Sequence, residues 1–176
     1  MGIAHHKMKI NLRKVGSAHP TRLMPRLNTK LESEAAEFLV LGHLLLEGIS
    51  AFKAYTNFPG YDLIAADAAN NTSARIQVKS RYRTNYDGFI INKFNCDFVV
   101  LTLLNRGYSN GPDKNGDIGI KAPEFYVMPT DYILQVRDPN NNWGKINKSR
   151  LVGLANYKDN WNAIKGFLEN VNKVNI

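Results

Sequence analysis

Gln77 and Lys79 are the residues of this chain whose types and spacing best suit chemistry on an anionic substrate. They lie in the run 74–83, ARIQVKSRYR, in which apolar and polar residues alternate as in a strand. Because side chains alternate between the faces of a strand, Gln77 and Lys79 share one face. Three further cations follow the same alternation and are expected to bind nucleic acid: Arg75, Arg81 and Arg83. The alternative interpretation is the solvated outer face of an edge strand.

Asp62 supplies a carboxylate that local folding would bring to this pair. It lies in the preceding apolar run, and the turn signal Asn70-Asn71 predicts a hairpin between the two runs. A turn centred there places Asp62 opposite Lys79, and a register change of one or two residues leaves it beside Gln77 or Lys79. An exposed Asp–Lys salt bridge is the plainer alternative. Asp67 is a competing acid that we expect to be solvated, because it lies near the turn.

A helix predicted from Thr29, its N-cap, to Gly48 supplies further carboxylates. Its apolar residues project onto one arc that we expect to face the core: Leu31, Phe38, Leu39, Leu41, Leu44 and Leu45. The opposite side is expected to expose Glu32, His43 and Glu47. Glu34 and Glu37 project inside the apolar arc, where a carboxylate is costly unless it is paired or binds a cation. We therefore expect one or both to have a partner, such as a metal, a lysine or a backbone amide.

Carboxylates and a lysine gathered on a basic protein suit the metal-dependent cleavage of a phosphodiester. Oxygen ligands favour Mg²⁺ or Mn²⁺. Such a metal polarises a phosphoryl oxygen and lowers the pKa of an attacking water. The lysine can position that water or balance charge on the phosphorus.

The elements that would position these residues predict a mixed α/β (α+β) domain. Strands are predicted at 49–55, 61–68, 74–83, 97–104 and 124–128. The run 97–104 is continuously apolar and is expected near the centre of the sheet. A short helix is predicted after Pro129, an amphipathic helix over 159–171, and loops at 105–122 and 138–150. This order predicts a mixed α/β sandwich on a mostly antiparallel sheet.

The ordered set Glu37, Asp62 and Gln77-Val78-Lys79 resembles the signature of the PD-(D/E)XK nuclease superfamily. That signature is a helical Glu, an Asp at the start of a strand, and (D/E)-x-K on the next strand. Wider stretches are also similar to small endonuclease-like members: AEFLVLGHLLLEG at 36–48, GYDLIAAD at 60–67, RIQVKSR at 75–81, EFYVMP at 124–129 and YKDNWNAI at 157–164. The resemblance covers most of residues 31–168.

The resemblance implies a restriction-endonuclease-like fold, with an αβββαβ core in which helices flank a central mixed sheet, and magnesium-dependent hydrolysis of DNA. It implies that Asp62 is the central metal ligand, with the Gln77 side chain and the Val78 carbonyl as further ligands. Lys79 would assist the nucleophilic water. Glu37, rather than Glu34, would support the metal directly or through water.

The chain departs from the superfamily pattern at two places. Gln77 replaces the acid of the (D/E)-x-K triplet, which lowers the expected metal affinity unless Glu37 compensates. In the segment Phe58-Pro59-Gly60-Tyr61, two residues also separate Pro59 from Asp62, so the Pro-Asp pair of the signature is absent. The main alternative is therefore a nuclease-fold protein that binds nucleic acid without cutting it. A third interpretation is a structural subunit whose basic segment binds a protein or RNA partner.

The charge of the chain favours a polyanionic partner. Its 176 residues carry a net charge of +8. Seven cations precede the first acid, Glu32: Lys7, Lys9, Arg13, Lys14, Arg22, Arg26 and Lys30. We divide the chain into a basic N-terminal arm, residues 1–28, and a single domain, residues 29–176. We expect nucleic-acid contacts from Arg13 and Lys14 and from a second patch near Trp143: Lys145, Lys148 and Arg150.

DNA is the expected partner, and cutting both strands of a duplex would need two sites. We therefore expect a homodimer or a higher homo-oligomer. Cys96 is the only cysteine, so no intramolecular disulfide can form, and a reducing cytoplasm is the expected compartment. No apolar run reaches the ~18 residues that a membrane helix needs.

Overall fold

The computed structural model of the chain describes residues 28–54 and 60–170. Arg13, Lys14 and most of the predicted basic arm lie outside these residues. Five strands form the central sheet in the order β1-β2-β3-β5-β6. Their bounds are Ala51–Lys53 (β1), Leu63–Asp67 (β2), Thr72–Arg81 (β3), Phe98–Leu103 (β5) and Glu124–Pro129 (β6). Only β3 and β5 pair in parallel, so the predicted mixed, mostly antiparallel sheet is confirmed.

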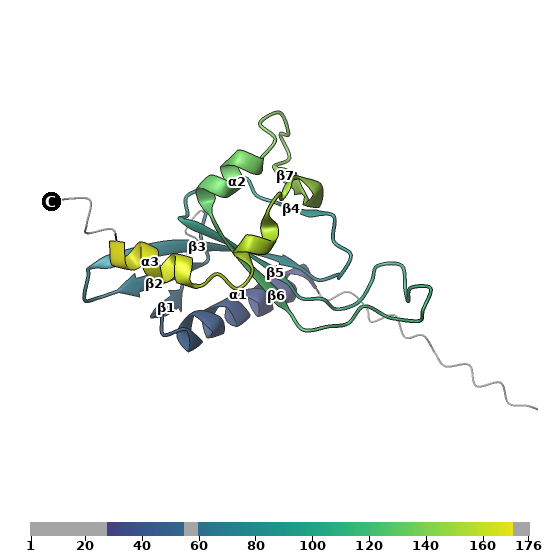
Figure 1. The fold of residues 1–176 in the computed structure, drawn as a ribbon, viewed down its shortest axis with the longest axis horizontal. Coiled ribbons are helices and arrows are strands. Elements are labelled where there is room, and N and C mark those ends of the chain that lie inside the picture. The colour runs from purple at the N-terminus through teal and green to yellow at the C-terminus, as the bar shows by residue number, and fades with distance from the viewer. Residues whose placement is uncertain (1–27, 55–59, 171–176) are drawn as a thin grey trace, which may run out of the picture.

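Helices and a small second sheet cover the two faces of this sheet (Figure 1). Helix α1 (Thr29–Leu46) and helix α3 (Asn162–Asn170) share one core with residues of β2, β3, β5 and β6. The other face packs against helix α2 (Thr130–Val136) and the antiparallel pair β4 (Gly88–Ile90) and β7 (Lys145–Asn147). Two short 3₁₀ helices, η1 (Lys148–Arg150) and η2 (Leu154–Tyr157), precede α3. The predicted α/β class with flanking helices is confirmed.

Strand β5 lies near the middle of the sheet, as its continuous apolar run predicts. All of its residues are buried, because β3 and β6 pair with its two edges and the two cores cover its two faces. The connection from β3 to β5 differs from the helix implied by an αβββαβ order: its described residues contain β4 and no helix. The segment 138–150, expected to be a loop, contains β7.

Helix α1 begins and faces differently from the prediction. Its N-cap is Asn28, whose side chain accepts a hydrogen bond from the Lys30 N–H at 2.9 Å. Its inner face is formed by Glu32 and by small or medium residues one turn apart: Ala36, Val40 and Leu44. Most of the larger apolar residues expected in the core point outward: Leu31, Phe38, Leu39 and Leu45.

His43 and Glu32, expected on the solvent side of α1, turn inward. The His43 ring lies 4.3 Å from the Phe125 ring and 5.4 Å from the Trp161 ring, measured between centroids. Glu32 is only 4% exposed. A helical projection assumes that the most apolar face of a helix faces the core. When both faces carry apolar residues, this assumption can select the wrong face. Among the described residues, no helix is long and apolar enough to cross a membrane.

Candidate active site

The β2–β3 hairpin brings Asp62 to Gln77 and its neighbours, as the sequence predicts, in a different register. Leu63 pairs with Ile76, so Asp62 is level with Gln77 rather than with Lys79. The difference arises because the turn is centred one residue earlier than expected, with Asp67 paired to Thr72, and this moves the partner of Asp62 by two residues. The prediction that Asp62 lies beside Gln77 is therefore confirmed.

The Asp62 carboxylate binds the backbone of β3 at the point where regular pairing of the hairpin ends. The Asp62 N–H still donates to the Ile76 carbonyl at 2.9 Å. One step further along β3, the Val78 N–H donates to Asp62 Oδ2 at 2.7 Å instead of to a strand carbonyl. This contact holds the carboxylate against the backbone between Gln77 and Lys79.

Burial makes the charge on Asp62 costly. It raises the pKa of the Asp62 carboxyl, and the Val78 N–H and the charges of Lys79 and Lys53 only partly oppose that effect. Burial also lowers the pKa of the Lys79 ammonium, against the attraction of Asp62. A nearby group of opposite charge would stabilise the charged form of each residue. For the Asp62 carboxylate, a bound divalent cation would be such a group.

Gln77 places an acceptor without a partner in the same region. Its side chain is only 7% exposed, and its Oε1 accepts no hydrogen bond from the described residues. A buried acceptor left unsatisfied costs about 1–3 kcal/mol, so such groups usually mark a bound ion, water or ligand. The edge-strand interpretation of β3 is wrong, because β3 is the third of the five strands and Gln77 is buried.

Lys53, which the sequence analysis did not select, connects the helix carboxylates to this site. Lys53 Nζ lies 2.5 Å from Glu34 Oε2 and 2.8 Å from Glu37 Oε2. The expectation that one or both glutamates have a partner is thus confirmed, and that partner is a lysine of β1. Lys53 is the only charged residue of the predicted strand 49–55, and a lone charge in an apolar strand is the signal that could have revealed it.

Glu37 is electrostatically close to Asp62. Burial raises the pKa of the Glu37 carboxyl, Lys53 opposes that effect, and the charge of Asp62 adds to it. Glu37 is the more enclosed of the two glutamates: its side chain is 16% exposed, and that of Glu34 is 46% exposed. Both observations favour Glu37 over Glu34 as the helix carboxylate of the site.

The oxygen donors near Asp62 suit a hard divalent cation that is bound by few negatively charged side chains. Among the described residues, no group of three or more His, Cys, Asp and Glu side chains is arranged to hold a metal. Gln77 offers an amide rather than a carboxylate, and the Glu37 carboxylate lies 2.8 Å from Lys53 Nζ. The donors that remain are two carboxylates, the unpaired Gln77 Oε1 and the Val78 carbonyl. Oxygen donors of this kind suit Mg²⁺ or Mn²⁺.

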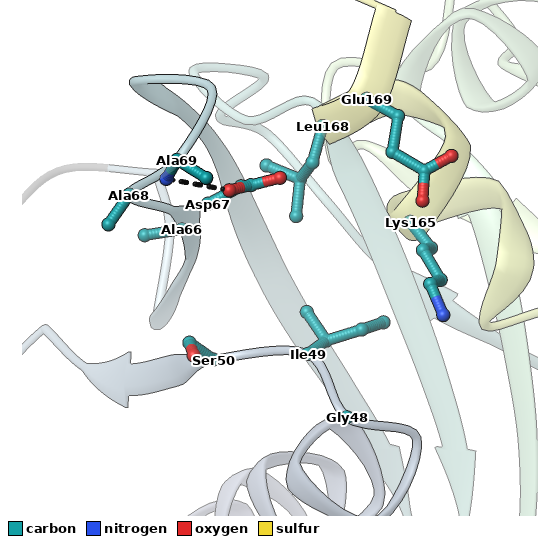
Figure 2. Close-up of a pocket in the computed structure, with 10 residues that line it drawn as sticks. All are labelled: Gly48, Ile49, Ser50, Ala66, Asp67, Ala68, Ala69, Lys165, Leu168 and Glu169. Atoms are coloured by element: carbon teal, nitrogen blue, oxygen red, sulfur yellow. Dashed lines mark hydrogen bonds between the residues drawn. The ribbon is translucent and has the colours of Figure 1, made fainter.

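Asp67, the competing acid, belongs to a different part of the molecule. Its carboxylate accepts hydrogen bonds from the N–H groups of Ala69 and Asn70 and from the Asn70 side chain, and these bonds lower its pKa. Figure 2 shows it at the end of β2, lining a separate pocket that Lys165 and Leu168 of α3 line from another side. Asp67 therefore stabilises the hairpin turn and is a useful control for Asp62.

Those cations predicted to bind nucleic acid that lie within the described residues have partners in the chain. Two arginines of β3 donate hydrogen bonds, Arg75 to the Asp97 carboxylate and Arg81 to the Gly88 carbonyl. Arg83, two residues after β3, donates to the Tyr108 carbonyl. The residues of the second patch are also engaged: Lys145 with Asp87, Lys148 over the Tyr86 ring and Arg150 with the Val136 carbonyl. These contacts fix the side chains, and their role in nucleic-acid binding stays a prediction.

Comparison with known proteins relates the fold of this chain to that of a nuclease. No protein-family model matches the sequence, and no curated protein matches it. Among solved structures, the chain is similar to a bacterial homing endonuclease, I-Ssp6803I, with a TM-score of 0.53 and 18% sequence identity. The match covers 84% of this chain and 99% of the endonuclease. At this identity the similarity shows a shared fold.

Proposed function

We propose that this protein is a metal-dependent endonuclease of the PD-(D/E)XK type that hydrolyses DNA phosphodiester bonds. The observation that carries the proposal is the placement of Asp62. Its carboxylate is half-buried and held on the β3 backbone at Val78, between Gln77 with its unpaired Oε1 and Lys79. The fold shared with a homing endonuclease and the net charge of +8 support the same conclusion.

Each residue of the site has a role in this proposal. Asp62, Gln77 Oε1 and the Val78 carbonyl would hold Mg²⁺ or Mn²⁺, with Glu37 supporting them. The cation, when bound, would lower the pKa of a water and polarise the scissile phosphate. Lys79 would orient the attacking water, and its depressed pKa lets it exchange a proton more readily than an exposed lysine. Lys53 would hold the Glu37 carboxylate in place.

The experiment that tests the proposal is cleavage of supercoiled and branched DNA in Mg²⁺, in Mn²⁺ and in chelator. Wild type is compared with Asp62→Ala, Lys79→Ala and Asp67→Ala. We expect metal-dependent cutting by wild type, a loss of at least about 100-fold in the Asp62 and Lys79 variants, and little change in Asp67→Ala. The Asp67 variant is the matched control because Asp67 ends strand β2, which Asp62 immediately precedes, and its carboxylate caps the turn.

Two outcomes would contradict the proposal. Cutting that survives both Asp62→Ala and Lys79→Ala would rule out this site. Wild type that binds DNA but cuts no substrate in either metal would indicate the alternative, a nuclease-fold protein that binds nucleic acid without cutting it.

A further inference from the structure

The outward face of α1 is largely apolar, and the one charged side chain between Leu31 and Phe38 on this face is Glu34, which pairs with Lys53 at 2.5 Å. Leu31, Phe38 and Leu45 are 60%, 53% and 54% exposed, and their seven-residue spacing places them in one stripe. Leu39 and Leu46 flank this stripe. Contiguous apolar surface of this kind usually marks an interaction site. The inner face of the same helix already packs on the sheet, and a helix that is apolar all round is normally buried on both sides.

We propose that this stripe of Leu31, Phe38 and Leu45 packs antiparallel against the same stripe of a second copy of the chain. The partner would be related by a twofold axis at Phe38. The proposal goes beyond the proposed function and does not depend on it, because it concerns how the chain associates without DNA.

The stripe has the internal symmetry that such a contact requires. A twofold interface uses one surface patch on both subunits, so the patch must complement itself. Leu31 and Leu45 each lie seven residues from Phe38, so antiparallel pairing sets every Leu31 against the partner's Leu45. The two Phe38 rings then meet at the axis. A patch for an unrelated protein would have no reason to be symmetric about its centre.

Neighbouring positions show the same complementarity. In this register Ala35 faces the partner's Leu41, which sets a small residue against a large one. Antiparallel helices also set opposite ends of their dipoles together. The 18 residues of α1 give a seam of about 27 Å.

The proposed interface lies next to the candidate active site. Lys53 Nζ is 4.6 Å from the centroid of the Phe38 ring and binds Glu37 on its other side. Contacts at the centre of the dimer would therefore restrict the side-chain conformations of Lys53, which binds the Glu37 carboxylate. Each dimer would carry two such sites.

The test is the molar mass of the full chain in DNA-free solution, measured by sedimentation equilibrium over a range of concentrations. We expect wild type to be a dimer of the 19.8 kDa chain. Leu31→Lys and Leu45→Glu should each weaken association by at least about tenfold, because each buries an unpaired charge in the seam. The double variant should recover much of the loss, since the two new charges face each other across the axis. The matched control is Leu134→Glu on α2, where the leucine is 45% exposed.

The outcomes separate this proposal from others. A wild type that is monomeric at all concentrations would overturn it and leave the stripe to another occupant, such as residues 1–27 or a different protein. A dimer that both single variants leave intact would place the interface elsewhere. A double variant that remains a monomer while circular dichroism shows it folded would exclude the antiparallel register. DNA cleavage is not a readout here, so failure of the proposed function would not be confused with failure of this interface.

Discussion

Asp62 carries a charge that is expected to reduce the stability of the protein at neutral pH. Burial raises the pKa of its carboxyl above the ordinary value, so the native state binds this proton more tightly than the unfolded chain does. The contribution of Asp62 to stability therefore falls as pH rises through the carboxyl range, and at neutral pH its charge is a cost. Aspartic acids in ordinary ion pairs show the opposite dependence.

We therefore predict that Asp62→Asn stabilises the metal-free protein at pH 7. Asparagine is neutral at every pH, and its Oδ1 can accept the same hydrogen bond from the Val78 N–H. The midpoint of thermal unfolding should rise by roughly 2–4 °C for each kcal/mol gained. The gain should shrink under acid conditions, where Asp62 is itself protonated. Circular dichroism in chelator at two pH values measures both effects.

Asp67→Asn is the control for this measurement, and we expect the opposite sign. Hydrogen bonds from Asn70 lower the pKa of Asp67, so its charge contributes stability at neutral pH that disappears as pH falls. A fall in the unfolding midpoint of Asp62→Asn at pH 7 would show that its carboxylate is needed for the fold itself.

Gln77 is the neutral side chain among the proposed metal ligands, so replacing it with an acid is informative. Gln77→Glu adds a carboxylate beside Asp62, and hard cations bind carboxylate more strongly than amide oxygen. We predict that Mn²⁺ affinity rises by about tenfold, or about 1.4 kcal/mol, while stability without metal falls. Calorimetric titration measures the first effect and thermal unfolding the second. Unchanged Mn²⁺ affinity would mean that Gln77 is not a ligand.

The sequence revealed those site residues that local folding brings together. Asp62, Gln77 and Lys79 meet across a single hairpin, so alternation and a turn signal were sufficient to group them. Lys53 could not be placed in this way. Its contacts with Glu34 and Glu37 depend on how α1 packs on β1, which is a tertiary feature. The apolar arc of α1 pointed in the wrong direction for the same reason.

At the scale of elements, the two-stranded β4–β7 sheet is the feature that the sequence did not predict. Each strand has three residues, too few for alternation to be read, and their partners lie far apart in the chain. Its position depends on Gly88. This residue has a φ of 148° and its Cα lies against the backbone of Ile146. The Gly88 carbonyl also accepts a hydrogen bond from Arg81 at the end of β3.

We predict that Gly88→Ala destabilises the protein by about 2 kcal/mol or more. A Cβ at this position would collide with the Ile146 carbonyl, and the backbone conformation disfavours any residue other than glycine. The free energy of unfolding in urea measures the effect. Gly42→Ala on α1 is the control, because a Cβ there meets nothing and alanine is the better helix former. Equal stability of Gly88→Ala and wild type would show that the β4–β7 pair can shift at little cost.

At the scale of the whole molecule, the excess of positive charge is concentrated before the folded domain. Many cations within the domain have partners there, such as Lys145 with Asp87 and Arg75 with Asp97. Residues 1–28 contain six cations and no acid. If the chain binds DNA as proposed, residues such as Arg13 and Lys14 should therefore release many of the counterions that leave the DNA on binding.

We predict that the double variant Arg13→Gln, Lys14→Gln weakens DNA binding and flattens its dependence on salt. Each phosphate contact contributes about 0.9 to the slope of log affinity against log salt, so losing two contacts should reduce the slope by about 1.8. The matched control is Lys145→Gln with Lys148→Gln, because these ammonium groups already lie against Asp87 and the Tyr86 ring. Fluorescence anisotropy on one duplex at several salt concentrations, with Ca²⁺ in place of Mg²⁺ to limit cleavage, measures all three proteins. An unchanged slope in the arm variant and a reduced slope in the control would instead place the DNA over β7 and its neighbours.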